Sequence, residues 1–116
     1  MSQSIIRERS YAFALGLVEL HRELVASREY ILSRQMLRAG TSVGANVEEA
    51  LAAQSRRDFV SKLSIARKEA RECRYWLRLL RDSNILPGPR ADPMIDEADA
   101  LVRILTSIIL SSTRNS

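Results

Sequence analysis

The chain of 116 residues has one cysteine, one histidine and four glycines, and these scarcities exclude several classes of protein. Cys73 alone cannot form an internal disulfide, and a lone cysteine fits a reducing cytoplasm. Zinc needs several Cys or His ligands, and a di-iron bundle needs Glu-x-x-His twice, whereas the residue three before His21 is Val18. No glycine-rich phosphate loop or nucleotide fingerprint is present. We therefore expect neither a metal nor a cofactor.

Catalytic arrangements are missing as well. His21 lies off the apolar seam of its helix, so we expect it on the surface, and Cys73 lies on a seam as a small apolar filler. Glu48 and Glu49 are adjacent, which on a helix points them about 100° apart and not at one substrate. The apolar runs fall short of the roughly 18 to 20 residues that span a bilayer. The sequence predicts a cytoplasmic protein that is not an enzyme and does not contact a membrane.

What the chain does have is apolar residues in four segments, at alternating steps of three and four, the pattern of helices packed against one another. Three prolines and Gly88 fall within residues 87–93, where we expect the third helix to end and Pro93 to open the fourth. We expect helices at about 4–26, 28–53, 55–84 and 93–112, and one domain, 1–116. Short turns between long helices predict an all-α fold, an up-down-up-down four-helix bundle.

The expected seam of each helix is a regular series. The first is Phe13, Leu17, Leu20 and Leu24; the second Leu32, Met36, Ala39, Val43, Asn46, Ala50 and Ala53; the third Phe59, Leu63, Ala66, Ala70, Cys73, Leu77 and Leu80; the fourth Ala98, Leu101, Leu105 and Ile108. Asn46 in such a seam indicates a structural polar core, together with Glu49, because a buried amide must find partners and so fixes register. A polar pocket of Asn46, Glu48 and Glu49 is the functional alternative.

Positive charge gathers on the third helix. Residues 54–86 hold nine basic and four acidic residues, and the rest of the chain is nearly neutral. Five arginines repeat at steps of four and three: Arg67, Arg71, Arg74, Arg78 and Arg81. Like charges four residues apart cost a few tenths of a kcal/mol per pair, so partners outside the helix must offset them. Those partners are carboxylates, such as Glu19 and Glu23 or another subunit's Glu69 and Glu72, or nucleic-acid phosphates.

A second face of the third helix repeats with the same spacing and carries the only tryptophan: Ile65, Glu69, Glu72, Trp76 and Leu79. Tryptophan is enriched at the centres of protein contacts, so these five residues are the candidate subunit interface. The alternative is that Trp76 and Leu79 only widen the core of the single chain.

Two stretches, "RAGTSVGANVEEA" and "DFVSKLSIARKEARECRYWLRLL", resemble the bacterial four-helix-bundle family first found encoded by intervening sequences within large-subunit ribosomal RNA genes. The resemblance covers roughly residues 10–110. It departs at Gly44, where the family commonly has proline, and at Ala50, where it has glycine. Asn46 and Glu49 match motif positions. The resemblance implies a homopentamer and kinship with the accessory proteins of diversity-generating retroelements, basic pentamers that bind a reverse transcriptase and nucleic acid.

Two hypotheses about function follow. In the first, a homo-oligomeric bundle binds RNA or DNA without sequence preference through the five arginines, as an accessory to a nucleic-acid enzyme such as a reverse transcriptase. In the second, it is an oligomeric scaffold or protein-interaction module whose arginines pair with carboxylates. Only Tyr75 and Trp76 lie near the arginines, so base-specific reading is not expected.

Overall fold

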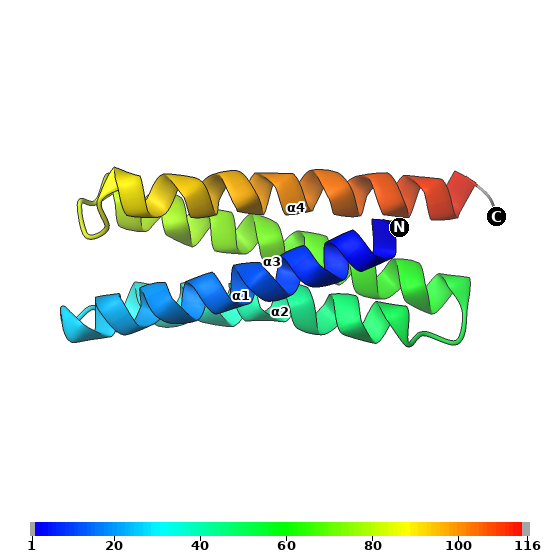
Figure 1. The fold of residues 1–116 in the computed structure, drawn as a ribbon, viewed down its shortest axis with the longest axis horizontal. Coiled ribbons are helices and arrows are strands. Elements are labelled where there is room, and N and C mark those ends of the chain that lie inside the picture. Colours follow the sequence, from blue (N-terminus) through cyan, green and yellow to red (C-terminus); the bar gives the residue numbers. More distant parts are fainter. Residues whose placement is uncertain (1, 115–116) are drawn as a thin grey trace.

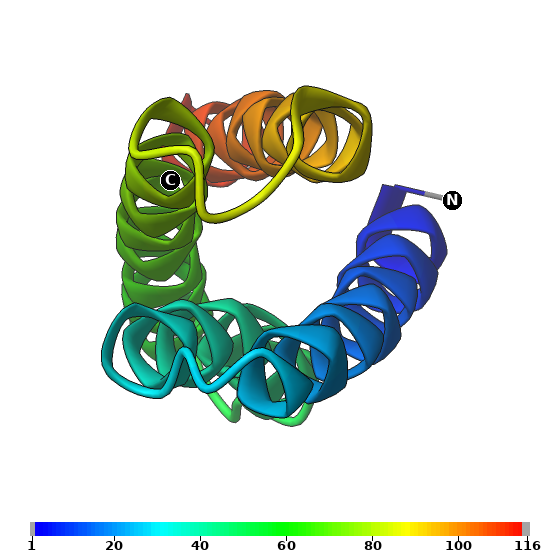
Figure 2. The ribbon, with the colours of Figure 1, turned by 90° about the vertical axis from the view of Figure 1, so that its left-hand side faces the viewer.

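The computed structural model describes residues 2–114, and all four of its elements are helices. They are α1 (Ser2–Ala26), α2 (Ile31–Leu51), α3 (Arg56–Asp82) and α4 (Gly88–Arg114). Successive helices run in opposite directions (Figure 1), and seen from one end they stand around a common axis in chain order (Figure 2). The predicted all-α four-helix bundle is confirmed. No helix in this part of the chain is long and apolar enough to cross a membrane.

The seams of α1, α3 and α4 lie in the core as predicted, apart from Phe59, which is only partly buried. Each of the three presents a single line of apolar side chains inward, because residues three and four apart share one side of a helix. Cys73 is fully buried among them, and burial raises the pKa of its thiol. It is therefore an apolar filler, as its seam position predicts.

The predicted seam of α2 is wrong in part. The buried residues are Ser33, Met36, Ala39, Gly40, Val43, Val47 and Ala50. Val47 is fully buried, whereas Asn46 is only half-buried and its Nδ2 donates to the Ser42 carbonyl at 2.8 Å. Because that bond satisfies the amide within its own helix, Asn46 needs no partner in the core. Glu49 is exposed, so neither member of the predicted polar core lies in the core of the single chain.

Gly40 lies where three helices pack closely together. A Cβ atom at this position would lie 1.9 Å from Leu17 Cδ1 of α1 and 3.0 Å from Cys73 Sγ of α3. Leu17 and Cys73 are both fully buried. The missing side chain of Gly40 is therefore what lets α1 and α3 pack against α2 at this level.

The second helix begins at Ile31 and not near residue 28. Arg28 has a φ of 65°, a left-handed conformation that cannot belong to a right-handed helix. Glu29 Oε2 then accepts hydrogen bonds from the backbone N–H groups of Leu32 (2.9 Å) and Ser33 (3.3 Å). The carboxylate of Glu29 thus caps α2 and sets its first turn.

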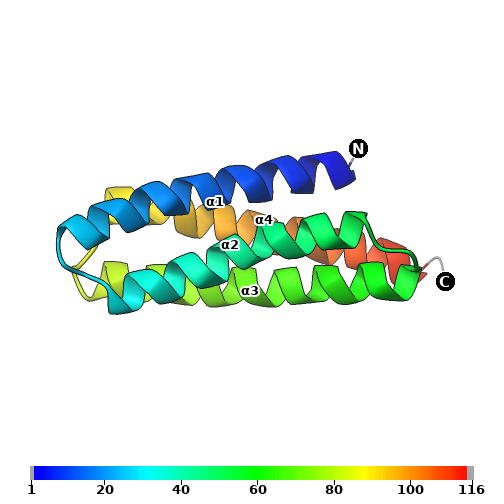
Figure 3. The ribbon, with the colours of Figure 1, turned by 90° about the horizontal axis from the view of Figure 1, so that it is seen from below.

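The third helix begins as predicted, because the Ser55 hydroxyl accepts a hydrogen bond from the Asp58 N–H at 3.0 Å. Figure 3 shows this turn between α2 and α3 at one end of the bundle. The helix ends at Asp82, two residues early, because Asn84 adopts a φ of 62°. Asparagine tolerates this conformation better than most residues.

The fourth helix begins at Gly88 and not at Pro93, which corrects the predicted start. The carbonyl of Pro87 accepts the N–H groups of Arg90 and Ala91, both at 3.0 Å, and so forms the first turn. Pro89 lies in this first turn, where proline is tolerated because the backbone N–H groups have no partner in the helix. Pro93 lies inside α4. The third helix has therefore already ended before the proline-rich segment, and that segment does not interrupt α4.

The first and last helices are joined by polar contacts. Arg9 of α1 holds Glu97 of α4 in a two-pronged ion pair, with bonds of 2.9 and 2.6 Å. Nearer the other end, Arg90 Nε donates to Glu23 Oε1 at 3.1 Å, and Arg90 Nη2 pairs with Glu23 Oε2. Two arginine–glutamate pairs thus close the bundle between α1 and α4.

Candidate nucleic-acid interface

The five arginines of α3 divide into two sets. Arg67, Arg74 and Arg81, here called the inner arginines, are half-buried, whereas Arg71 and Arg78 are exposed. The inner arginines are seven residues apart and contact α4. Arg67 Nη1 donates to Thr106 Oγ1 at 3.3 Å, and Arg74 Nε lies 2.6 Å from Asp99 Oδ1. The single stripe of the sequence is therefore two parallel lines in the structure.

Each inner arginine has a polar partner within the chain. Arg81 donates to Asp82 at 2.8 Å and to Asp92 at 3.0 Å, and these bonds raise the pKa of its guanidinium. The Arg74 Nε–H is not aligned with the Asp99 oxygen, so that contact is an ion pair and not a hydrogen bond. Carboxylates were predicted as partners, but these lie on α3 and α4. The candidate Glu23 pairs with Arg90 instead.

Beyond Ser61, the outer face of α3 carries three exposed cations, Lys68, Arg71 and Arg78, here called the outer cations. None of the three has a hydrogen bond or an ion pair within residues 2–114. Tyr75 lies on the same line, 53% exposed. Residues 68, 71, 75 and 78 are three, four and three apart, so they share the side of α3 that faces away from the core. Lys68 and Arg78 act on the charges of Glu72 and Asp82 at longer range only. Three positive charges without a direct ion pair thus flank one exposed aromatic ring.

The sequence identifies the outer face of α3 only once the buried residues of that helix are known. The spacing of arginine alone groups the inner and outer residues together, because positions 67, 71 and 74 are also four and three apart. Lys68 and Tyr75 fall outside that arginine pattern and were not predicted as site residues. They are identified because they lie on the side of α3 opposite its buried residues.

The predicted interface residues are engaged within the chain to different degrees. Arg38 of α2 donates to Glu69 at 3.0 Å and also pairs with Glu72. Trp76 is partly buried against the core, and its Nε1 donates to Glu72 Oε2 at 3.1 Å. These carboxylates already have an arginine, and it is not a neighbouring subunit's. The two apolar ends of this face, Ile65 and Leu79, are 40% and 37% exposed.

His21 is partly exposed, but its ring has a partner that the sequence did not predict. Its Nδ1 lies 2.7 Å from the hydroxyl of Ser33, which is fully buried on α2. A substrate cannot reach a serine with no exposed surface, so this pair ties α1 to α2 and is not a catalytic dyad. Among the residues described, no three His, Cys, Asp or Glu side chains lie where they could hold a metal ion.

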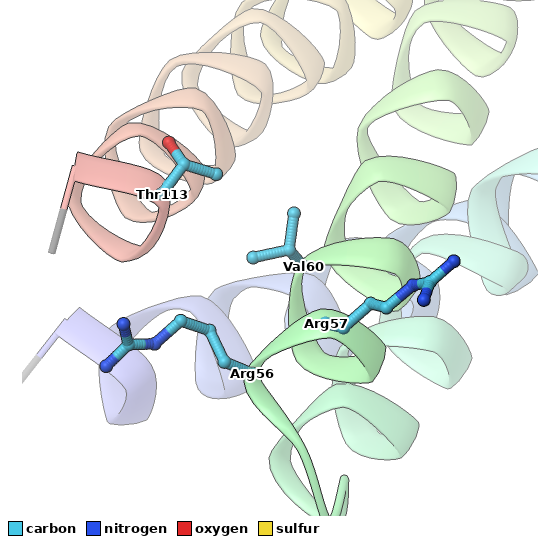
Figure 4. A pocket seen from close by; sticks show the side chains of 4 residues that line it. All are labelled: Arg56, Arg57, Val60 and Thr113. Carbon is cyan, nitrogen blue, oxygen red and sulfur yellow. The ribbon is translucent and has the colours of Figure 1, made fainter. Parts of the chain in front are cut away.

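The pockets are open surface hollows. Figure 4 shows one of about 380 Å³, between the start of α3 and the end of α4, lined by Arg56, Arg57, Val60 and Thr113. The guanidinium groups of Arg56 and Arg57 point in opposite directions, away from Val60. They do not converge on one anion. The outer face of α3 is therefore the stronger candidate site.

Comparisons with known proteins agree with the predicted family. Residues 2–107 match the family model of the 23S rRNA-intervening sequence protein. The chain is 40% identical to a crystal structure of a protein with unknown function from the S23 ribosomal protein family of Bacteroides thetaiotaomicron VPI-5482, with a TM-score of 0.92 over 94% of this chain and 98% of that one. No curated protein matches. The chain therefore belongs to the 23S rRNA-intervening sequence protein family.

Proposed function

We propose that this protein is a non-enzymatic nucleic-acid-binding bundle, which contacts the phosphates of RNA or DNA through the outer face of α3. One observation carries the proposal: Lys68, Arg71 and Arg78 are exposed, lie on one line, and have neither an ion pair nor a hydrogen bond within residues 2–114. Like charges so close together repel one another, and an anionic partner would remove that cost.

The chemistry of the outer cations favours phosphate. Arginine presents a planar fork of donors that matches two phosphate oxygens, and lysine acts as a point charge. The inner arginines stay with α4 in this proposal, since displacing Arg74 would leave Asp99 without its partner. Binding would be insensitive to sequence, because phosphate contacts position a protein without reading bases.

We also propose that the chain assembles with copies of itself, and the resemblance to the family implies a pentamer. Ile65 and Leu79 support a contact between subunits, because both are exposed apolar residues beside the outer face. A ring of five would repeat the outer cations around the assembly and multiply their attraction for a polyanion. Such a ring suits an accessory to a nucleic-acid enzyme such as a reverse transcriptase.

Fluorescence anisotropy with a labelled oligonucleotide, at several salt concentrations, tests the binding. The variant Arg71→Gln/Arg78→Gln should bind more weakly and show a shallower dependence on salt, because each lost phosphate contact lowers the slope of log K against log salt by about 0.7 to 0.9. The matched control Arg28→Gln/Arg103→Gln removes two exposed charges that do not belong to α3. Equal effects of the two variants, or no binding at low salt, would refute the proposal.

The scaffold alternative has its own support in the exposed apolar side chains of α3. Light scattering of the wild type and of Ile65→Glu/Leu79→Glu measures whether the chain assembles and whether this face is used. Leu110→Glu, an exposed leucine of α4, is the control. An assembly lost only in the α3 variant, in a protein that binds no nucleic acid, would favour the scaffold.

A further inference from the structure

The aromatic ring of Tyr75 on the outer face is exposed between two arginines, where a nucleic-acid base could stack on it. Tyr75 lies four residues after Arg71 and three before Arg78, so each arginine is about one helical turn away, on either side of the ring. More than half of the side chain is exposed. An exposed aromatic between two cations that form no ion pair resembles surfaces that bind single strands, in which bases stack on rings and positive charges hold the backbone.

Three successive contacts fix the direction of this ring. Arg38 pairs with Glu72, Glu72 accepts the indole N–H of Trp76 at 3.1 Å, and the rings of Trp76 and Tyr75 meet edge to face, with centroids 5.1 Å apart and planes at 73°. The bonds from Trp76 and Arg38 lower the pKa of Glu72, so the carboxylate stays ionised and keeps both partners. Trp76 is thus held on two sides, and Tyr75 rests against it.

We propose that the outer face of α3 binds single-stranded nucleic acid in preference to duplex, with an unpaired base stacked on Tyr75 and the flanking phosphates held by Arg71 and Arg78. This inference rests on the proposed function and specifies the preferred ligand as single-stranded nucleic acid. In a duplex the base faces are already stacked on one another, and freeing one costs a few kcal/mol. A single strand offers its bases without that cost.

Electrostatics alone predicts the opposite preference. A duplex carries one phosphate charge per about 1.7 Å of axis, a higher density than a single strand, so cations without an aromatic contact should favour duplex. A preference for the single strand therefore reports the ring and not the charges. This difference makes the inference testable with probes of one sequence.

The experiment compares labelled oligo(dT) of 20 nucleotides with the same strand annealed to oligo(dA), by anisotropy at fixed salt. The wild type should bind the single strand more tightly. Tyr75→Leu, which keeps an apolar side chain but removes the π face, should weaken single-strand binding by roughly 5- to 100-fold and leave duplex binding unchanged. Tyr75→Phe should behave as the wild type. All three side chains are exposed on a helix, so circular dichroism melts should stay close together.

Each other outcome has a definite meaning. Equal binding of both probes by the wild type, or an equal loss of both in Tyr75→Leu, overturns the inference and leaves the proposed function standing. Loss of binding in Tyr75→Phe would assign the effect to the hydroxyl and overturn stacking. No binding of either probe at low salt overturns both. Trp76 supplies a second readout, since it is the only tryptophan and touches Tyr75: its emission should change on binding oligo(dT) in the wild type and not in Tyr75→Leu.

Discussion

Replacing Gly40 with alanine should destabilise the bundle, whereas the same replacement at Gly44, one turn later in α2, should stabilise it. The new Cβ at position 40 would lie 1.9 Å from Leu17 Cδ1 and 3.0 Å from Cys73 Sγ. At position 44 it would meet the Ser10 carbonyl oxygen at 3.4 Å, an ordinary contact. The two variants share one chemical change and one helix, so they differ mainly in the space around the new methyl group.

The magnitudes follow from two opposing effects. Alanine is about 1 kcal/mol more favourable than glycine inside a helix, and this gain applies at both positions. Overpacking a well-filled core costs about 1–3 kcal/mol, and the cost should fall in the upper part of that range because Leu17 is fully buried. Gly40→Ala should therefore lower the free energy of unfolding by about 1–2 kcal/mol. Gly44→Ala should raise it by about 0.5–1 kcal/mol.

Urea unfolding followed by circular dichroism, at one protein concentration because assembly affects apparent stability, measures both changes. Thermal midpoints should move by roughly 4 °C per kcal/mol for a chain of this length. Leu17→Val removes the atom that clashes, so the pair Leu17→Val/Gly40→Ala should be more stable than the sum of its single changes predicts. If Gly40→Ala were as stable as Gly44→Ala, the close approach of α1, α2 and α3 would be refuted.

Three further predictions concern single residues. The Cys73 thiol should react with Ellman's reagent only as fast as the protein unfolds, because it is buried and its raised pKa disfavours the thiolate; fast labelling of folded protein would contradict its burial. The pKa of Glu72 is lowered on folding, so the stabilising effect of its carboxylate is complete at neutral pH and is lost as the pH falls below about 4.5. The difference in unfolding free energy between the wild type and Glu72→Gln should therefore shrink in that range. A difference that stays constant would count against the ion pair. Ser55→Ala should cost about 1 kcal/mol by removing the cap of α3, while Ser61→Ala, an exposed change on the same helix, should cost little.

The sequence predicted the fold well where bulky apolar residues define one side of a helix. Leu17 and Leu20 of α1, or Leu77 and Leu80 of α3, leave no other direction for the core. In α2 the buried side contains Ala39, Gly40 and other small residues, so the sequence of this helix does not define which side faces the core. The contacts of Gly40 with Leu17 and Cys73 determine that side. Because these contacts lie between helices, the spacing of residues within one helix cannot predict them.

The candidate site was predictable in composition but not in arrangement. The excess of positive charge on α3 is visible in the sequence, and so is its helical spacing. Which arginines find a partner depends on where Asp92, Asp99 and Thr106 of α4 come to lie, which is set by the packing of α3 against α4. The partner of His21 was not predicted for the same reason, since Ser33 belongs to the next helix. Partners across helices are fixed by tertiary packing.

The division of the α3 arginines has a consequence for how this surface can evolve. Changing an inner arginine disturbs contacts with α4, so a compensating change on that helix is needed. The outer cations touch no such partner within residues 2–114, so their charge can be lost, strengthened or reversed while the bundle keeps its packing. If the proposed function holds, the affinity for an anionic partner and the stability of the fold are therefore separable traits on one helix, and selection can change the affinity without a compensating change in the core.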